Sequence, residues 1–209
     1  MKINEIFYSI QGEGSRAGLP NIFIRTTGCN LRCSFCDTIY AYDEGTEMTN
    51  DAILQKIETY PCSSVCITGG EPLLQKDIVD LISGLLKKKY DISVESNGSI
   101  PLKSIAGKKH VMISLDIKCP SSEMHMNMCF ENLSLLTKND QVKFIINTKD
   151  DYEYAKTILL TYKPLGTIFF QPVWGTDPRK LANWILHDGL SVRLGVQLHK
   201  IVFGNARGI

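Results

Sequence analysis

The stretch Gly28-Cys29-Asn30-Leu31-Arg32-Cys33-Ser34-Phe35-Cys36 sets the interpretation of the whole chain. It places three cysteines close together, directly after an apolar, β-branched run at Ile22–Thr26. Thiolates are the ligands of iron–sulfur clusters, and three of them leave one iron of a four-iron cluster open. We therefore predict that Cys29, Cys33 and Cys36 hold a [4Fe-4S] cluster whose open iron is the place of chemistry.

A structural zinc site is the main alternative for these cysteines. Such a site needs four ligands, which commonly come as paired C-x2-C units. The first histidine, His110, lies far along the chain, and Cys66 lies within an apolar run typical of a strand. The ligand count favours the cluster, and a zinc-stabilised binding module is the non-enzymatic alternative.

Short apolar runs alternate with helical patterns along the rest of the chain. This alternation predicts βαβ units and a parallel sheet whose strands are apolar on both faces. The expected strands are Ile22–Thr26, Val65–Thr68, Ile92–Glu95, Val111–Leu115, Val142–Ile146 and Thr167–Phe170.

Capping residues and apolar spacing predict the helices between these strands. Thr49 and the pair Asp177-Pro178 are helix-start signals, and Asp150 or Asp151 could cap a helix that runs through Leu160. Ser121 or Ser122 could start another helix that reaches about Thr137. An apolar stripe at helical spacing is formed by Leu74, Ile78, Leu81, Ile82 and Leu85.

The chain is too short for a complete (β/α)8 barrel, which takes ~250 residues. We expect an α/β fold, an incomplete (β/α)6 TIM-like barrel with a small N-terminal hairpin from Ile3 to Ile10 and back, as one domain over residues 1–209. In such barrels the site lies at the C-terminal ends of the strands.

Composition excludes several other classes of function. The net charge of +1 predicts no nucleic-acid or anionic-membrane partner, and no apolar run approaches the ~20 residues of a membrane span. The first ten residues lack the apolar core of a signal peptide, so we expect a cytoplasmic protein. Seven cysteines in that compartment are ligands or buried thiols rather than disulfides.

The cysteine spacing, together with Thr68-Gly69-Gly70-Glu71-Pro72 after the next parallel strand, resembles the radical S-adenosylmethionine (SAM) superfamily. The resemblance implies that the open iron binds the methionine end of SAM and that the reduced cluster cleaves SAM to a 5′-deoxyadenosyl radical. It also implies that Phe35 lies near the adenine and that Gly70 and Glu71 contact the methionine end.

A second set of motifs resembles the 7-carboxy-7-deazaguanine synthase family over nearly the whole chain. These motifs are Phe7–Gly14, Arg25, Cys36-Asp37-Thr38 and Gln197–Lys200. The family converts 6-carboxy-5,6,7,8-tetrahydropterin to 7-carboxy-7-deazaguanine with loss of ammonia, for the biosynthesis of deazapurines such as queuosine and archaeosine. The resemblance also implies a homodimer, Mg2+, and a reducing electron donor such as flavodoxin or ferredoxin.

The same resemblance assigns residues to roles. It implies Mg2+ binding by Thr38, for which a turn cap is the structural alternative. It implies SAM contacts from Asp116, Ile117 and Lys118, where a local ion pair is the alternative, and from Gln171, Pro172, Val173 and Trp174. For the substrate, the resemblance implies contacts from Ile10, Gln11, Gly12, Glu13, Arg25, Thr68, His199 and the Ile209 carboxylate.

A glycyl-radical-enzyme activase is the closest rival within the superfamily. Such an activase is also short and carries the same cysteine spacing, but it binds a protein rather than a pterin. The segment Gln11-Gly12-Glu13-Gly14 and the residue Thr38 favour the synthase.

Overall fold

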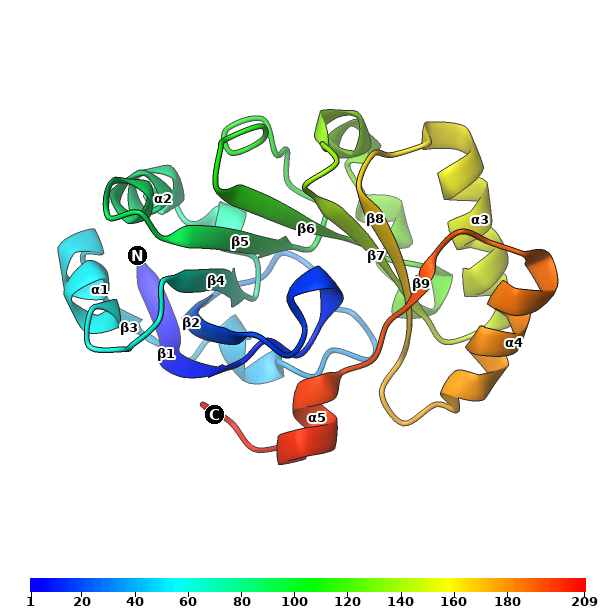
Figure 1. The fold of residues 1–209 in the computed structure, drawn as a ribbon, viewed down its shortest axis with the longest axis horizontal. Coiled ribbons are helices and arrows are strands. Elements are labelled where there is room, and N and C mark those ends of the chain that lie inside the picture. Colours follow the sequence, from blue (N-terminus) through cyan, green and yellow to red (C-terminus); the bar gives the residue numbers. More distant parts are fainter.

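A nine-stranded sheet lies at the centre of the computed structural model, which describes residues 1–209 (Figure 1). Strand β1 pairs antiparallel with β2 and β3, whereas every pair from β2 to β9 is parallel. The strands lie in the order β3 (Thr46–Glu47), β1 (Lys2–Ile10), β2 (Pro20–Thr26), β4 (Ser64–Gly69), β5 (Asp91–Ser96), β6 (Val111–Ile117), β7 (Gln141–Ile146), β8 (Thr167–Pro172) and β9 (Arg193–Leu194). The six predicted parallel strands are confirmed as β2 and β4 to β8.

The N-terminal hairpin is part of this sheet rather than a separate unit before it. Its return arm is β2, which is also the first parallel strand, so β1 extends the sheet by one antiparallel strand. The loop between the two arms contains a 3-10 turn at Gly14–Arg16.

The helices are α1 (Asn50–Ile57), α2 (Ile78–Lys87), α3 (Lys149–Tyr162), α4 (Pro178–Asp188) and α5 (Leu198–Phe203). Thr49 and Asp177 cap α1 and α4 as predicted, since their side chains accept from the amides of Ala52 and Arg179. The predicted start of α3 at Asp150 or Asp151 is wrong, because Thr148 is its cap and Asp151 completes a capping box. Leu74 lies before α2 and is exposed, so it is not part of the buried stripe. None of the five helices has the length and hydropathy needed to cross a membrane.

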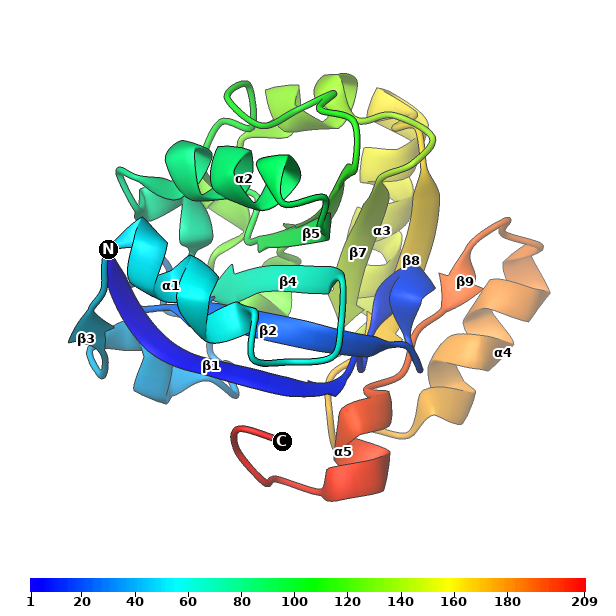
Figure 2. The same ribbon diagram turned by 60° about the vertical axis from the view of Figure 1, so that its left-hand side comes forward.

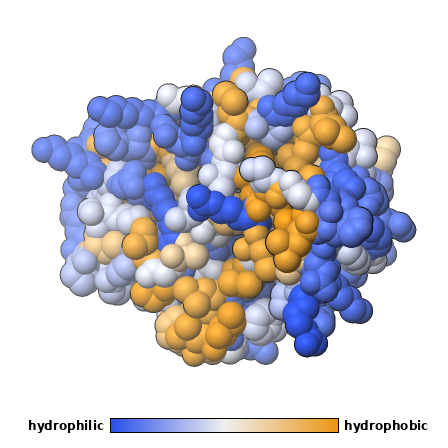
Figure 3. All heavy atoms as spheres, turned by 45° about the vertical axis from the view of Figure 1, so that its right-hand side comes forward, coloured by the Kyte–Doolittle hydropathy of each residue, from blue (hydrophilic) through white to orange (hydrophobic).

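The two edges of the curved sheet face each other across α5. Figure 2 shows β1 and β2 on one side, β9 and α4 on the other, and α5 below them. Apolar side chains gather on the face that carries α4, β9 and α5 (Figure 3), and Leu194, Val196, Ile201 and Val202 are exposed in this part of the chain.

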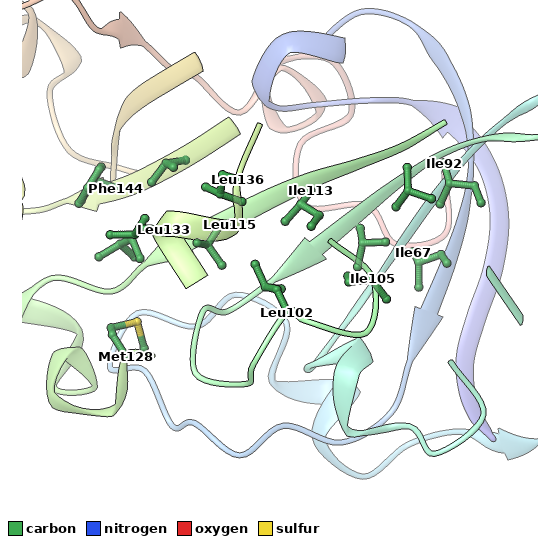
Figure 4. Close-up of a cluster of buried hydrophobic side chains, with 14 of the residues drawn as sticks. Ile67, Ile92, Leu102, Ile105, Ile113, Leu115, Met128, Leu133, Leu136 and Phe144 are labelled. Atoms are coloured by element: carbon green, nitrogen blue, oxygen red, sulfur yellow. The ribbon is translucent and has the colours of Figure 1, made fainter. Parts of the chain in front are cut away.

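Two of the crossovers between parallel strands contain no α-helix. The predicted helix from Ser121 or Ser122 to Thr137 is wrong, because this segment forms three 3-10 turns at Pro120–Ser122, His125–Asn127 and Phe130–Leu135. The crossovers still cover the sheet, since they bury apolar side chains against β5, β6 and β7 (Figure 4). The buried crossover residues are Leu102, Ile105, Met128, Leu133 and Leu136.

The two faces of the sheet differ in chemistry. Successive side chains alternate between the faces, and one face carries the core residues, such as Val94, Leu115 and Phe144. The other face carries polar or charged side chains, including Glu95, Asp116 and Lys143. The prediction of strands that are apolar on both faces is therefore wrong, because the inner face lines the barrel and carries a charged cluster.

Candidate active site

Two loops at the C-terminal ends of β2 and β4 are joined through their backbones. The amide of Glu71 donates to the carbonyl of Gly28 at 2.8 Å, and that of Gly70 donates to Thr26 at 3.2 Å. A Cβ atom on Gly70 would lie 2.1 Å from the Gly28 oxygen, so only glycine fits this contact. The predicted cysteine loop and the predicted SAM loop are thus one structural unit.

The three cysteines of this unit are partly buried, unpaired thiols. Cys29 Sγ accepts from the Leu31 amide at 3.4 Å and from Asn97 Nδ2 at 3.6 Å. Burial raises the pKa of the Cys33 thiol, and the ammonium of Lys118 opposes that shift.

The loop from Cys29 to Cys36 carries the three thiols, and they do not form a site for a single metal ion. No three His, Cys, Asp or Glu side chains converge on one point, but cluster thiolates bind different iron atoms and need no common point. Gln171 Oε1, a buried acceptor atom without a hydrogen-bond partner, lies on one predicted SAM segment. Asp116 Oδ1, on another, lies 3.3 Å from Lys143 Nζ. The three thiols therefore suit an iron–sulfur cluster, and the buried acceptor atoms suit a ligand with several hydrogen-bond donors.

Glu71 is fully buried, and its carboxylate is used inside the protein. It accepts from the Leu73 amide at 3.0 Å, the Asn97 amide at 2.6 Å and the Ser96 hydroxyl at 3.2 Å. Burial raises its pKa to about 7, despite these hydrogen bonds. The carboxylate therefore holds the ends of β4 and β5 together, and a cofactor contact from Glu71 would come from its backbone.

Asn97, at the end of β5, is a site residue that the sequence analysis missed. Its amide group contacts Cys29 Sγ and donates to Asn30 Oδ1 at 3.1 Å. The available signal was its position, since Asn97-Gly98 directly follows a parallel strand, where sites of this fold lie.

A charged cluster occupies the inner face below the cysteine loop. Lys143 Nζ lies 2.8 Å from carboxylates of both Glu13 and Glu95 and 3.3 Å from Asp116. Lys118 Nζ lies 2.9 Å from the other oxygen of Asp116, so the local ion pair is present. Lys143 and Glu95 were missed, because each stands alone in an apolar strand pattern.

The predicted substrate segment after β1 is joined to the C-terminal segment. The Leu198 amide donates to the Gly12 carbonyl at 2.9 Å, and Gln197 Nε2 donates to Glu13 Oε1 at 2.8 Å. A Cβ on Gly12 would lie 1.8 Å from His199 Nδ1, so the His199 ring packs directly on Gly12. The structure therefore brings together Gly12, Glu13 and His199, and it buries Gln11 beside them.

Arg25 and Thr68 are neighbours on adjacent strands. Arg25 Nε lies 2.7 Å from Glu5 Oε1, and the two terminal nitrogens of the guanidinium make no hydrogen bond within the protein. These terminal nitrogens are free to bind a carboxylate in the bidentate manner typical of arginine.

The remaining predicted residues lie around this centre. Thr38 donates to Asp37 Oδ1 at 3.0 Å and makes no side-chain cap hydrogen bond. Ile209 is exposed at the end of a tail that Arg207 fixes to Glu44 at 2.8 Å. Pro172, Val173 and Trp174 line a pocket of about 330 Å3 together with Val196, Gln197 and Ile201.

Comparisons with known proteins agree with this geometry. A family model described as the radical SAM superfamily matches residues 23–170. A 7-carboxy-7-deazaguanine synthase from Methanospirillum hungatei is 41% identical over 203 residues, covering 97% of this chain and 85% of that protein. One from Thermoplasma acidophilum is 36% identical over 209 residues and covers 100% of both. The crystal structure of QueE from Escherichia coli has the same fold, with a TM-score of 0.79, 23% identity and coverage of 95% and 94% of the two chains.

The raised pKa of Glu71 predicts a pH dependence of stability. The native state keeps a proton up to about pH 7 that the unfolded state loses near 4.5, so the stabilising contribution of Glu71 falls as the pH rises between these values. We expect the difference in unfolding free energy between the wild-type apoprotein and Glu71→Gln to fall by about 3 kcal/mol over this range. Urea unfolding at several pH values measures it.

Glu153→Gln is the control, since hydrogen bonds from Lys156 and Lys149 lower the pKa of this exposed carboxylate. Its contribution should grow as the pH rises. A constant difference for Glu71→Gln would contradict the prediction.

Proposed function

Because this chain belongs to the radical SAM superfamily and to its 7-carboxy-7-deazaguanine synthase family, we propose that it converts 6-carboxy-5,6,7,8-tetrahydropterin to 7-carboxy-7-deazaguanine with loss of ammonia. The observation that carries the proposal is the joined unit of the cysteine loop and the Gly70 loop, with Arg25 and Glu13 on the barrel side of it. When bound, the reduced cluster and SAM would supply the carbon-centred radical chemistry that abstraction of a hydrogen atom from the substrate requires.

The cofactor's residues have distinct proposed tasks. Cys29, Cys33 and Cys36 hold the cluster, and the Leu31 amide and the Asn97 side chain orient the Cys29 sulfur. Phe35 and the backbone at Gly70 and Glu71 line the SAM side. Gln171 Oε1, which has no hydrogen-bond partner within the protein, accepts a hydrogen bond from SAM, and so does the Asp116 carboxylate that Lys143 and Lys118 hold. The pocket at Pro172, Val173 and Trp174 receives part of the adenosyl group of SAM. The backbone at Ile117 and Lys118 completes this set.

The proposed substrate residues lie on β2 and β4, in the loop after β1, and in the C-terminal segment that bonds to this loop. The free guanidinium nitrogens of Arg25 bind the pterin carboxylate, with Thr68 beside them. Glu13, Gln11 and the backbone at Ile10 and Gly12 take the donors and acceptors of the pterin ring. His199 closes the site over Gly12, and the tail that carries Ile209 contacts Glu5, the partner of Arg25, through Arg207.

Further partners complete the proposal. An electron donor such as flavodoxin or ferredoxin reduces the cluster in the cytoplasm, and the single domain forms a homodimer, for which the exposed apolar side chains on β9 and α5 offer a face. Sedimentation equilibrium measures the oligomeric state. The product enters deazapurine biosynthesis.

The central experiment is anaerobic turnover. The reconstituted protein, incubated with SAM, a reductant, Mg2+ and the carboxytetrahydropterin, should yield 7-carboxy-7-deazaguanine by mass analysis. A brown protein with iron–sulfur absorbance that forms no such product would overturn the substrate assignment, whereas a colourless zinc-loaded protein would overturn the cluster.

Arg25→Lys tests the carboxylate contact. A lysine cannot form the bidentate pair, so the KM for the substrate should rise about tenfold or more while kcat changes less. Arg16→Lys is the control, because Arg16 pairs with Asp91 at the opposite end of the strands. Equal KM values for both variants would exclude Arg25 from the carboxylate site.

We assign Mg2+ to Thr38, whose hydroxyl lies next to the Asp37 carboxylate. Hydroxyl and carboxylate oxygens suit this ion. Chelation of Mg2+ should slow turnover, and Thr38→Val should raise the Mg2+ concentration for half-maximal rate about tenfold or more, by analogy with ligand-shell mutations. Thr38→Ser should retain the wild-type response, and a wild-type response in Thr38→Val would place the ion elsewhere.

A further inference from the structure

Lys143 is a buried ammonium at the centre of the charged cluster. It lies on β7 with its side chain 5% exposed, and its Nζ hydrogen-bonds Glu13 and Glu95 and forms an ion pair with Asp116. An ammonium has three donors, and each of its three carboxylate neighbours comes from a different part of the chain. Glu13 lies in the hairpin loop, Glu95 on β5 and Asp116 on β6.

The second oxygens of these carboxylates extend the network in two directions. Glu13 Oε1 accepts from Gln197, which precedes α5. Asp116 Oδ2 accepts from Lys118, which lies near Cys33. Lys143 is therefore the one cation that touches both the pterin side and the SAM side of the site.

We propose that Lys143 is a positioning residue that fixes the carboxylates of Glu13 and Asp116 and so links the pterin segment to the SAM segment. This inference rests on the proposed function. Lys143 itself touches neither ligand in this scheme and acts through the two carboxylates that it holds.

The charges around Glu13 explain why it needs this partner. The groups that face it are Lys143 from β7, Asp116 from β6, Glu95 from β5, and Gln197 and His199 from the C-terminal segment. Burial raises the pKa of Glu13, and Lys143 more than offsets this effect. Without Lys143, Glu13 would face two other carboxylates and would protonate or turn away, so the donor edge of the pterin would lose its acceptor.

Two measurable consequences follow from a misplaced Glu13 and Asp116. Substrate binding should weaken, and it should weaken further toward acidic pH as Glu13 takes up a proton. SAM cleavage should also lose its coupling to the substrate, so that more 5′-deoxyadenosine is released for each product formed.

The test compares Lys143→Met with Lys143→Arg and with the control Lys156→Met. Lys156 also pairs with two carboxylates, Glu153 and Asp188, but lies on α3 away from the site. Substrate Kd is measured by calorimetry at pH 6 and pH 8, and the ratio of 5′-deoxyadenosine to product is measured in anaerobic turnover.

We expect Lys143→Met to raise the substrate Kd at least tenfold at pH 8 and more at pH 6, and to raise the ratio severalfold. Lys143→Arg should bring the substrate Kd and the ratio of 5′-deoxyadenosine to product part of the way back to wild-type values. Lys156→Met should match the wild type in both quantities. Should Lys143→Met fail to fold, the double variant Lys143→Met/Glu95→Gln removes one charge of each sign and should show the same defects.

Wild-type values of Kd and of the ratio in the folded Lys143→Met or double variant would overturn the inference. If those variants match a wild type that does form product, only this inference fails. A wild type that neither binds nor converts the pterin removes the proposed function and this inference with it.

Discussion

Burying charge in the barrel is the constraint on which the site depends. A carboxylate or ammonium taken out of water is costly unless an opposite charge and hydrogen bonds meet it. The inner face meets this requirement with Lys143 and Lys118 among Glu13, Glu95 and Asp116. Because the partners come from separate strands and loops, the charges are satisfied only when the sheet has its native register, and the chemistry of the site and the geometry of the sheet are set together.

Much of the architecture, including the contact between the two loops proposed to bind the cofactor, could be predicted from the sequence. The six parallel strands, the caps at Thr49 and Asp177, and the meeting of the cysteine and Gly70 loops follow from local patterns and from the rule that parallel strands end at one edge. The segment from Pro120 to Leu135 could not be predicted, because its apolar spacing suits a helix, while Asn132 ties Ile100 and Leu102 to it by hydrogen bonds. No local sequence pattern predicts a hydrogen bond between such distant residues.

The missed site residues share a physical cause. Lys143 and Glu95 are single charges in apolar runs. The ion pair between them forms only when β5, β6 and β7 lie side by side in the sheet. Asn97 contacts the side chains of Cys29 and Asn30, which lie in a loop far away in the sequence. By contrast, the cysteines could be proposed as ligands from the sequence, because all three lie in one short loop, where residues close in sequence are also close in space.

The bond between Gln197 and Glu13 joins residues 184 positions apart. During synthesis the N-terminal parts of a chain fold first, and contacts of long sequence separation form last. The cysteine loop is therefore complete early, while the segment that closes over Gly12 arrives near the end of translation. In the nascent chain the three thiols are thus in place before residues 197–199 arrive to cover Gly12.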